Sequence, residues 1–251
     1  MKKINKLFNL ILPIITIAFL LLVWQVVAKV EDNEYVVPTT ISTLKELGLL
    51  LGEKKFYIAL GGTLLRSVIA FSLSFFVSAI FAYCASKRLW AEKLILPVIS
   101  ITRTLPTIAI AWLFLFWTDS QIAPVLITML VVLPTSYTQI KSALDSVNKN
   151  TLDAGKVDGA GWRNLFFKIE LPQIAPELYS VIGSGLALNF KLMVAAEVLS
   201  ATLKSLGNMI SLATPFEVAR VLALTVIVLV LGLIVEFLFN KLSKISASWK
   251  E

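Results

Sequence analysis

The chain has 251 residues, of which 57% are apolar and only 16% are charged, whereas about a quarter of a typical soluble domain is charged. So few charges cannot cover so apolar a chain with a polar surface, and the composition therefore predicts an integral membrane protein. The sequence contains no histidine, which excludes His-based catalytic triads, His metal sites and His pH switches. The single Cys84 excludes an internal disulfide and a cysteine cluster.

Six apolar stretches are long enough to cross a bilayer, which takes about 20 helical residues. In chain order they cover residues 7–28, 60–85, 94–117, 122–140, 174–199 and 218–239. The first is too long for the apolar core of a signal peptide and no cleavage site follows it, so we interpret it as a retained helix. The third contains Pro97 and Pro106, which a spanning helix tolerates where neighbouring helices cover the freed carbonyls.

Between the first two spans, residues 39–51 carry apolar side chains three to four positions apart. This spacing predicts a short amphipathic helix at the membrane surface.

The distribution of basic residues predicts the orientation of the chain. Six spans place both termini on the same side. If that side is the cytoplasm, the inside segments carry 14 Lys and Arg and the outside segments carry 5. The positive-inside rule therefore predicts that both termini are cytoplasmic. The same distribution assigns the net charge of +7 to a membrane surface and not to nucleic acid.

The longest inside segment, residues 141–173, has a helical pattern of its own. Thr151 is a candidate N-cap for a first helix. Gly159 and Gly161 are expected to break that helix. A second apolar helical pattern follows, and Leu171-Pro172 is expected to end it just before the fifth span. One interpretation is a compact knob that binds a cytosolic partner. The alternative is an ordinary loop whose charges only set the topology.

The residues of this loop resemble a known motif. Asp153-Ala154-Gly155, then Gly159, then Leu171-Pro172 look like the EAA loop of permeases from ATP-binding-cassette importers. That family has Glu where this chain has Asp153 and usually Ala where it has Gly155, a change that loosens a helix by up to about 1 kcal/mol. Other matches resemble the nitrate/sulfonate/taurine branch: Pro38 before the amphipathic stretch, Thr63-Leu64-Leu65-Arg66, Arg103-Thr104-Leu105-Pro106, Ala195-Ala196-Glu197 and Leu206-Gly207.

The resemblance implies an all-α integral membrane protein, with six transmembrane helices and a cytoplasmic coupling helix, the type I permease fold. It implies a single permease domain in the lipid of the bacterial cytoplasmic (inner) membrane, paired with a second copy of itself. A cytosolic ATP-binding subunit would dock on the coupling residues, and an extracytoplasmic solute-binding protein would deliver a sulfonate, taurine or nitrate. The alternatives are a thiamine pyrimidine precursor as the solute, and a stand-alone secondary carrier. The implied coupling residues are Asp153, Ala154, Gly155, Gly159, Leu171 and Pro172.

The chain is not expected to be an enzyme. No G-x-x-x-x-G-K-[ST] phosphate loop occurs, because Gly155-Lys156 is followed by Val157. ATP hydrolysis is therefore expected in a partner subunit, and no cofactor, metal or nucleic acid is expected here.

Charged residues inside the spans are functional candidates because a charge at membrane depth costs about 3 kcal/mol. Arg103 lies three residues before Pro106 and is expected near the midplane of the membrane. There its guanidinium could bind an oxyanion. The alternative is a structural role, in which Arg103 caps the carbonyls freed by the proline or pairs with a carboxylate. Lys191 and Glu197 lie six residues apart and are not expected to bridge. Glu197 is a candidate gate or pairing residue, or else an interfacial carboxylate. Arg66 is expected to extend to the outer surface.

Overall fold

Helices form most of the described part of the chain, which contains no strand. The computed structural model describes residues 2–214 and 217–247, and it describes side chains from residue 11 onward. The basic side chains of Lys2, Lys3, Lys6 and Lys250, which entered the charge comparison, lie outside this range. In chain order the elements are α1 (Lys2–Glu31), α2 (Thr40–Gly52), α3 (Lys54–Lys87), α4 (Leu89–Thr104), α5 (Thr107–Trp117), α6 (Ala123–Asp145), α7 (Lys149–Val157), α8 (Trp162–Leu165), the π-helix η1 (Phe166–Glu170), α9 (Leu171–Leu199), α10 (Leu206–Ala213) and α11 (Val218–Ala247).

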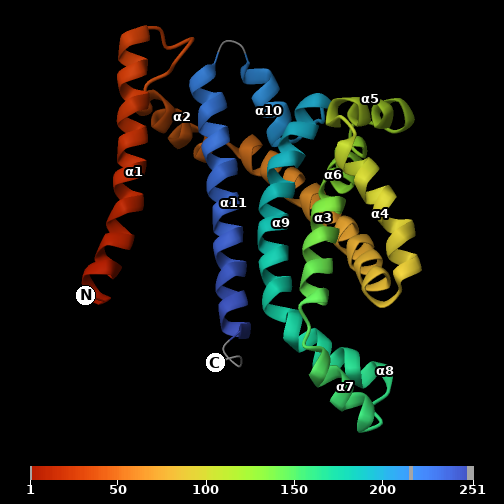
Figure 1. Cartoon of the computed structure of the whole chain (residues 1–251). Coiled ribbons are helices and arrows are strands. Elements are labelled where there is room, and N and C mark those ends of the chain that lie inside the picture. The colour runs from red at the N-terminus through yellow and green to blue at the C-terminus, as the bar shows by residue number, and fades with distance from the viewer. Residues whose placement is uncertain (1, 215–216, 248–251) are drawn as a thin grey trace.

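Five helices are individually long and apolar enough to cross a membrane: α1, α3, α6, α11 and the continuous helix Trp162–Leu199 that contains α9. A sixth crossing results if the bent pair α4 and α5 counts as one span. In Figure 1, α7 and α8 project at the end where α1 begins and α11 stops, whereas α2, α5 and α10 lie at the opposite end. We call these the knob end and the α10 end. Counted in this way the crossings are even in number, which agrees with α1 beginning at the same end where α11 stops (Figure 1).

The third span is not one helix, contrary to the prediction from its composition. α4 ends at Thr104, α5 starts at Thr107, and the two axes differ by 96°. The cause is Pro106, which offers no N–H to the preceding turn and holds the residue before it in extended backbone. Leu105 accordingly has φ −65° and ψ 131°. Pro97, by contrast, stays inside α4.

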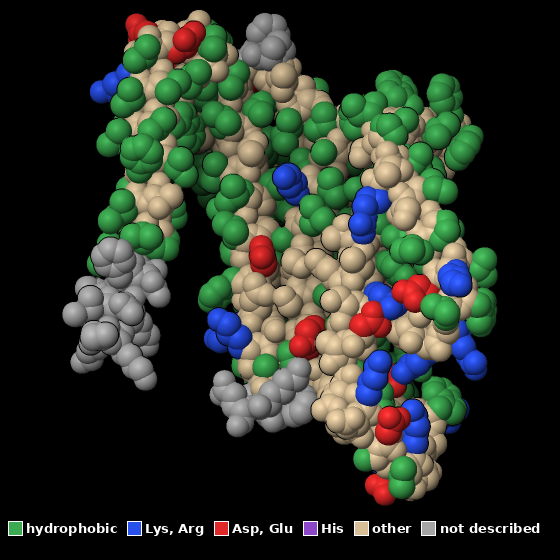
Figure 2. Space-filling view, in the orientation of Figure 1, with side chains coloured by type: hydrophobic (Ala, Val, Ile, Leu, Met, Phe, Trp, Pro, Cys, Tyr) green, Lys and Arg blue, Asp and Glu red, His purple; other side chains and the backbone are tan. Residues whose placement is uncertain are grey.

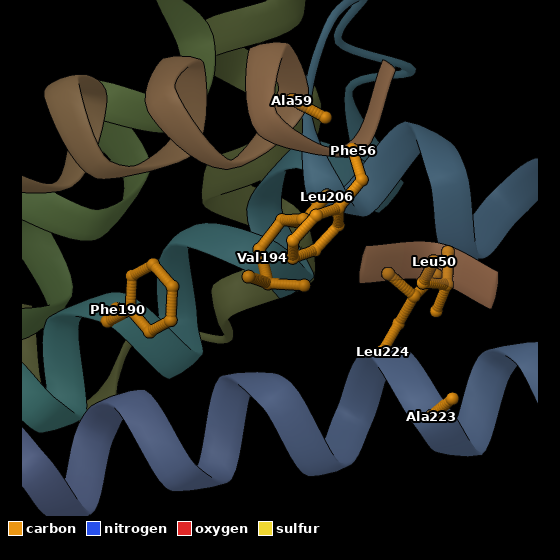
Figure 3. Packing of buried hydrophobic residues seen from close by; sticks show 8 residues of the cluster. All are labelled: Leu50, Phe56, Ala59, Phe190, Val194, Leu206, Ala223 and Leu224. Carbon is orange, nitrogen blue, oxygen red and sulfur yellow. The ribbon is translucent and has the colours of Figure 1, made fainter. Parts of the chain in front are cut away.

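The core lies where α3 packs on α6 and α9, with α11 on the other side of α9. Two glycines of α9 permit these close approaches, as small residues do between membrane helices. A Cβ on Gly183 would lie 2.6 Å from Phe239 of α11, and one on Gly185 would lie 2.6 Å from Phe71 of α3. Figure 3 shows the cluster of buried residues that fastens α2 and α10 onto this frame, formed by Leu50, Phe56, Ala59, Phe190, Val194, Leu206, Ala223 and Leu224.

The amphipathic helix predicted before the second span is confirmed as α2. Thr39 caps it by accepting a hydrogen bond from the Ser42 N–H at 3.2 Å. α2 also holds α1, which is otherwise almost entirely exposed. On α1, Trp24 Nε1 donates to the Pro38 carbonyl at 3.0 Å, and the Gln25 side-chain oxygen Oε1 accepts from the Thr40 hydroxyl at 2.7 Å.

Candidate functional site

The predicted two-helix knob is present and projects from the rest of the chain (Figure 1). Its first helix, α7, begins earlier than expected. Asn148, and not Thr151, is its N-cap, and the Asn148 side chain accepts from the Asn150 N–H at 2.9 Å. Asn148 has the extended backbone that a cap requires, whereas Thr151 already lies inside the helix. The turn that follows α7 contains Gly159 at φ +75°, a conformation that glycine adopts without a steric penalty.

At Gly155 the first helix of the knob, α7, packs closely against the second, which α8 and η1 form. A Cβ there would lie 2.9 Å from Leu165 of α8 and 2.8 Å from Ile169 of η1. The glycine that departs from the usual EAA pattern therefore permits close packing, which offsets its weaker helix propensity. Its neighbour Asp153 is exposed and forms an ion pair with Lys156 at 2.8 Å.

The tip of the knob combines apolar and charged side chains. Val157 is 87% exposed and Trp162 is 66% exposed, and the Arg163 guanidinium lies 5.5 Å from the Trp162 ring centre. Figure 2 shows charged side chains gathered over the same projection, whereas apolar side chains dominate at the opposite end. No residue of α7 is buried. An exposed surface that combines apolar and charged side chains in this way is typical of a site that binds another protein.

The prediction that Leu171-Pro172 ends the second helix is wrong. The helix runs without a break from Trp162 to Leu199. Before the proline it widens into η1, where the Leu171 N–H reaches back five residues to the Phe166 carbonyl. This π-helical turn lets the chain pass Pro172, which cannot donate a hydrogen bond, without ending the helix. The knob is therefore joined directly to a spanning helix.

Arg103 lies on the exposed side of the bend between α4 and α5. It is about 20 Å along α4 from the start of that helix. Its Nη2 donates to the Thr138 hydroxyl of α6 at 2.6 Å. Within the described part of the chain it therefore pairs with a hydroxyl and not with a carboxylate. Lys191 of α9 is also exposed, and Pro106 precedes α5 in extended backbone.

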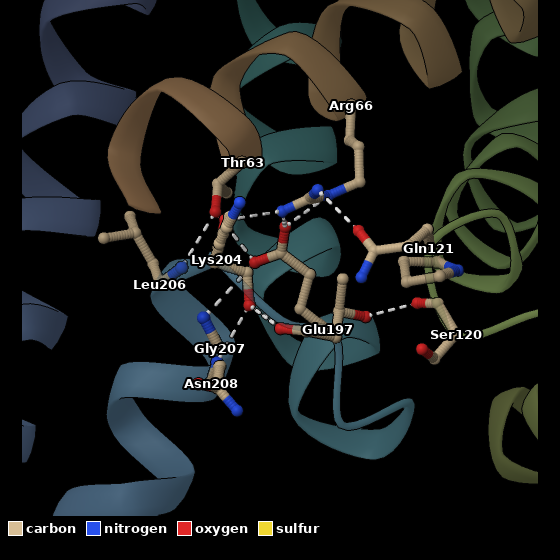
Figure 4. A network of polar contacts seen from close by, with 12 residues as sticks. Thr63, Arg66, Ser120, Gln121, Glu197, Lys204, Leu206, Gly207 and Asn208 are labelled. Carbon is tan, nitrogen blue, oxygen red and sulfur yellow. Dashed lines mark hydrogen bonds and ion pairs between the residues drawn. The ribbon is translucent and has the colours of Figure 1, made fainter. Parts of the chain in front are cut away.

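Glu197 is the centre of a buried polar network at the α10 end (Figure 4). Its side chain has 0% exposure. Its Oε1 accepts a hydrogen bond from Arg66 Nε at 2.9 Å and forms an ion pair with Arg66 Nη2 at 2.8 Å. Its Oε2 accepts from the Thr63 hydroxyl at 2.9 Å and from the Gly207 N–H at 3.2 Å. The Thr63 oxygen in turn accepts from the Leu206 N–H at 2.9 Å. We call Thr63, Arg66, Glu197, Leu206 and Gly207 the outer clasp, because the basic residues predict that this end faces away from the cytoplasm.

The outer clasp joins α3, α9 and α10. The fit is close at Gly207, where a Cβ would lie 2.5 Å from the Glu197 Cβ. Arg66 also donates to Gln121, before α6, at 3.3 Å and to the Lys204 carbonyl at 3.3 Å. The clasp therefore fixes the start of α10 to two spanning helices.

The clasp corrects the interpretation of Arg66, which pairs with Glu197 and does not extend into solvent. Thr63 was identified from the sequence only as part of a family match, without a partner, and Gln121 was not identified. The available signal was that Arg66 and Glu197 carry opposite charges near the same end of the second and fifth spans.

A cavity of about 620 Å³ opens at the α10 end, among the starts of α3 and α11 and one side of α10. On its wall Arg220 forms an ion pair with Glu53 at 2.6 Å. The volume lies in the range of pockets that hold small molecules, and the cavity is at the opposite end of the helices from the knob.

Solved structures identify the class of this fold. It resembles an inward-facing structure of the MetNI methionine ABC transporter with a TM-score of 0.64, at 15% identity over 75% of this chain and 94% of that one. It also resembles a structure of an amino acid ABC transporter with histidines, with a TM-score of 0.57, at 14% identity over 75% and 92% of the two chains. The fold is therefore that of a type I ABC importer permease.

The sequence identifies the family. The family described as "Binding-protein-dependent transport system inner membrane component" matches residues 74–244. The chain belongs to this family of bacterial inner-membrane transport permeases, which are not enzymes. A permease of this class works with an ATPase subunit and a binding protein.

The relatives differ in the solutes for which they are named. The formylaminopyrimidine transport permease protein ThiX of Halalkalibacterium halodurans is 23% identical over 95% of this chain and 96% of its own length. The taurine transport system permease protein TauC of Escherichia coli is 24% identical over 95% and 89%. The putative aliphatic sulfonates transport permease protein SsuC of Bacillus subtilis is 23% identical over 99% and 90%.

Proposed function

We propose that this chain moves a small sulfonate, taurine or nitrate through the membrane after a binding protein has delivered it. The observation that carries the ATP-driven part of this proposal is the exposed knob, which continues without interruption into α9. A partner that moves the knob therefore moves a spanning helix. The likeness to TauC and SsuC supports the solute class.

In this proposal the knob end faces the cytoplasm and both termini lie there. The support is the excess of 14 over 5 basic residues on that side. The ATPase subunit would bind the surface around Asp153, Ala154, Gly155 and Gly159. Leu171 and Pro172 lie where the knob joins α9 and transmit its movement.

The solute path would run past Arg103, Pro106 and Lys191. An arginine on a spanning segment is costly against lipid, by about 3 kcal/mol, and Arg103 is exposed in the single chain. A second copy of the chain that encloses a water-filled path would remove this cost. Within that path the Arg103 guanidinium suits the oxygens of a sulfonate or nitrate. Glu197 would act at the outer gate by holding α10, since its own carboxylate is enclosed.

A formylaminopyrimidine is the second candidate solute, because ThiX matches this chain over nearly the full length of both proteins. The two candidates differ in charge: a sulfonate is an anion, whereas the pyrimidine ring is neutral and would not need the Arg103 charge.

The docking role of the knob is tested with Val157→Asp. Val157 is 87% exposed, so the substitution removes little internal packing. We expect normal membrane insertion and loss of co-purification with the ATPase subunit. The matched control is Asn33→Asp, which adds the same charge at the α10 end and keeps the acceptor used by the Tyr35 N–H. If the ATPase subunit stays bound to the Val157→Asp variant, the proposed docking surface is wrong.

The solute is tested by uptake into proteoliposomes that hold the whole complex. Labelled taurine, an alkyl sulfonate, nitrate and a formylaminopyrimidine are supplied with and without ATP and binding protein. We expect taurine, the alkyl sulfonate or nitrate to accumulate only when both are present. Accumulation of the pyrimidine instead would establish the second candidate, and uptake driven by an ion gradient without ATP would refute the proposal.

A further inference from the structure

A buried carboxylate lies at the junction of the knob with α9. Glu170 is the last residue of η1 and is 5% exposed. Burying a carboxylate is costly unless it is paired. Its Oε1 accepts a hydrogen bond from Lys87 Nζ, and Lys87 is the last residue of α3. The junction is therefore tied by charge to a second spanning helix.

An aromatic contact reinforces this tie one turn earlier on α3. The Tyr83 ring meets the Phe166 ring edge-on, with centres 5.3 Å apart. Lys87 Nζ also lies 5.4 Å from the centre of the Tyr83 ring. Because Phe166 and Glu170 are the first and last residues of η1, the whole π-helical turn is held against the end of α3.

The position of this tie matters because η1 interrupts the regular α-helical pattern between α8 and α9. The hydrogen-bond pattern of a π-helix is widened, and such turns are common where helices act in function. Pro172 follows immediately and removes one more donor. If η1 flexed freely, movement of the knob would be lost there. The contacts of η1 with α3 restrain this flexing, and they also couple α3 to the movement of the knob.

The two helices are also tied at the other end. Arg66 of α3 pairs with Glu197 of α9 in the outer clasp, and Arg66 and Lys87 are about 30 Å apart along α3. α3 and α9 thus form a frame joined by one ion pair at each end.

We propose that Lys87 and Glu170 are positioning residues that pass movement of the knob to α3 as well as to α9. This inference rests on the proposed binding of the ATPase subunit to the knob. It assigns to the pair a role in coupling, which is separate from binding the ATPase and from hydrolysing ATP.

One feature of the carboxylate agrees with a role that involves rearrangement. Its second oxygen, Oε2, is buried and has no hydrogen-bond partner among the residues that the structure describes. A carboxylate with a purely structural role would accept hydrogen bonds at both oxygens, as Glu197 does in the outer clasp. The free acceptor leaves room for a second donor when the junction shifts.

The test uses Glu170→Gln, Lys87→Gln and the exchange Lys87→Glu with Glu170→Lys in the complete complex. We expect each single variant to assemble with the ATPase subunit and hydrolyse ATP. Solute moved per ATP should fall by about 5- to 10-fold, in the range of measured couplings between sites. The exchanged pair should recover most of this loss. Lys93→Gln, which removes an equal charge from an exposed position of α4 at the same end, should change the ratio less than about 2-fold.

Three results would overturn the inference: an unchanged ratio in both single variants, no recovery in the exchanged pair, or complexes that fail to assemble in all three variants. The last would show that the pair serves folding alone. Failure of the proposed function is a different outcome, since the Val157→Asp variant would then keep its ATPase subunit.

Discussion

Glu197→Gln is expected to destabilise the protein substantially, because it removes the charge at the centre of the outer clasp. Glu197 is fully buried, accepts a hydrogen bond from Arg66 Nε and forms an ion pair with Arg66 Nη2. Removing one partner of a buried ion pair costs about 3–5 kcal/mol. Arg66 is 14% exposed and keeps its bonds to Gln121 and Lys204, so we take the lower end, about 3 kcal/mol.

The assay is thermal unfolding of the detergent-solubilised protein. A loss of about 3 kcal/mol lowers Tm by about 6–12 °C for a chain of this size. Glu236→Gln is the matched control, because it makes the same change in a spanning helix at a carboxylate that is only half-buried; we expect a change within about 0.5 kcal/mol.

A double-mutant cycle separates the pair from the general effect of each substitution. Arg66→Met and Glu197→Gln together should cost less than the sum of the two single changes, because each removes the same interaction. Additive costs, or a Glu197→Gln variant that melts within about 2 °C of the parent, would refute the assignment of Glu197 as the centre of the clasp.

Two further predictions concern the knob and the path. Gly155→Val should push Leu165 and Ile169 away and weaken ATPase binding at least about 5-fold. Gly155→Ala should be nearly neutral, because the ends of the flexible Leu165 and Ile169 side chains can move aside. Alanine also gains up to about 1 kcal/mol of helix propensity over glycine. Both are measured by co-purification, and equal effects would contradict the packing argument. Arg103→Gln should lower anion uptake by at least about 10-fold with Tm nearly unchanged, because glutamine can keep a bond to Thr138; normal uptake would remove Arg103 from the proposed path.

The spanning helices were predictable because the membrane itself imposes the pattern. A run of about 20 apolar residues is required wherever a helix crosses hydrocarbon, and the amphipathic spacing of α2 is equally local. The turn at Gly159 was predictable for a similar reason, since a glycine between two helical patterns needs no distant partner to act.

Some predictions were wrong because the same residue type has different effects at two positions, and other features were missed because they depend on distant partners. Pro97 and Pro106 both lie in the third span, yet only Pro106 breaks it. Leu171-Pro172 has the local pattern of a helix end, but η1 and its contacts with α3 carry the helix through. Arg66 and Glu197 lie far apart in sequence, so their pairing is not visible in the pattern of either helix.

Gly207 provides a test of how tightly α10 is held. A Cβ at this position would lie 2.5 Å from the Glu197 Cβ, 2.7 Å from the Val198 nitrogen and 2.8 Å from the Val194 carbonyl oxygen. Two of these atoms belong to the backbone of α9, so α9 cannot yield and α10 must move away. That movement would break the Gly207 N–H bond to Glu197 and strain the Leu206 N–H bond to Thr63.

Gly207→Ala should therefore cost about 2–3 kcal/mol and lower uptake, although it adds only a methyl group. Gly48→Ala is the matched control, because a Cβ at Gly48 in α2 would meet nothing within 4 Å. Alanine there should stabilise the helix by up to about 1 kcal/mol. The two glycine-to-alanine changes are thus expected to shift Tm in opposite directions. If both raise Tm, α10 is not clamped by close contact with α9, and the outer clasp cannot act as the holder of the gate.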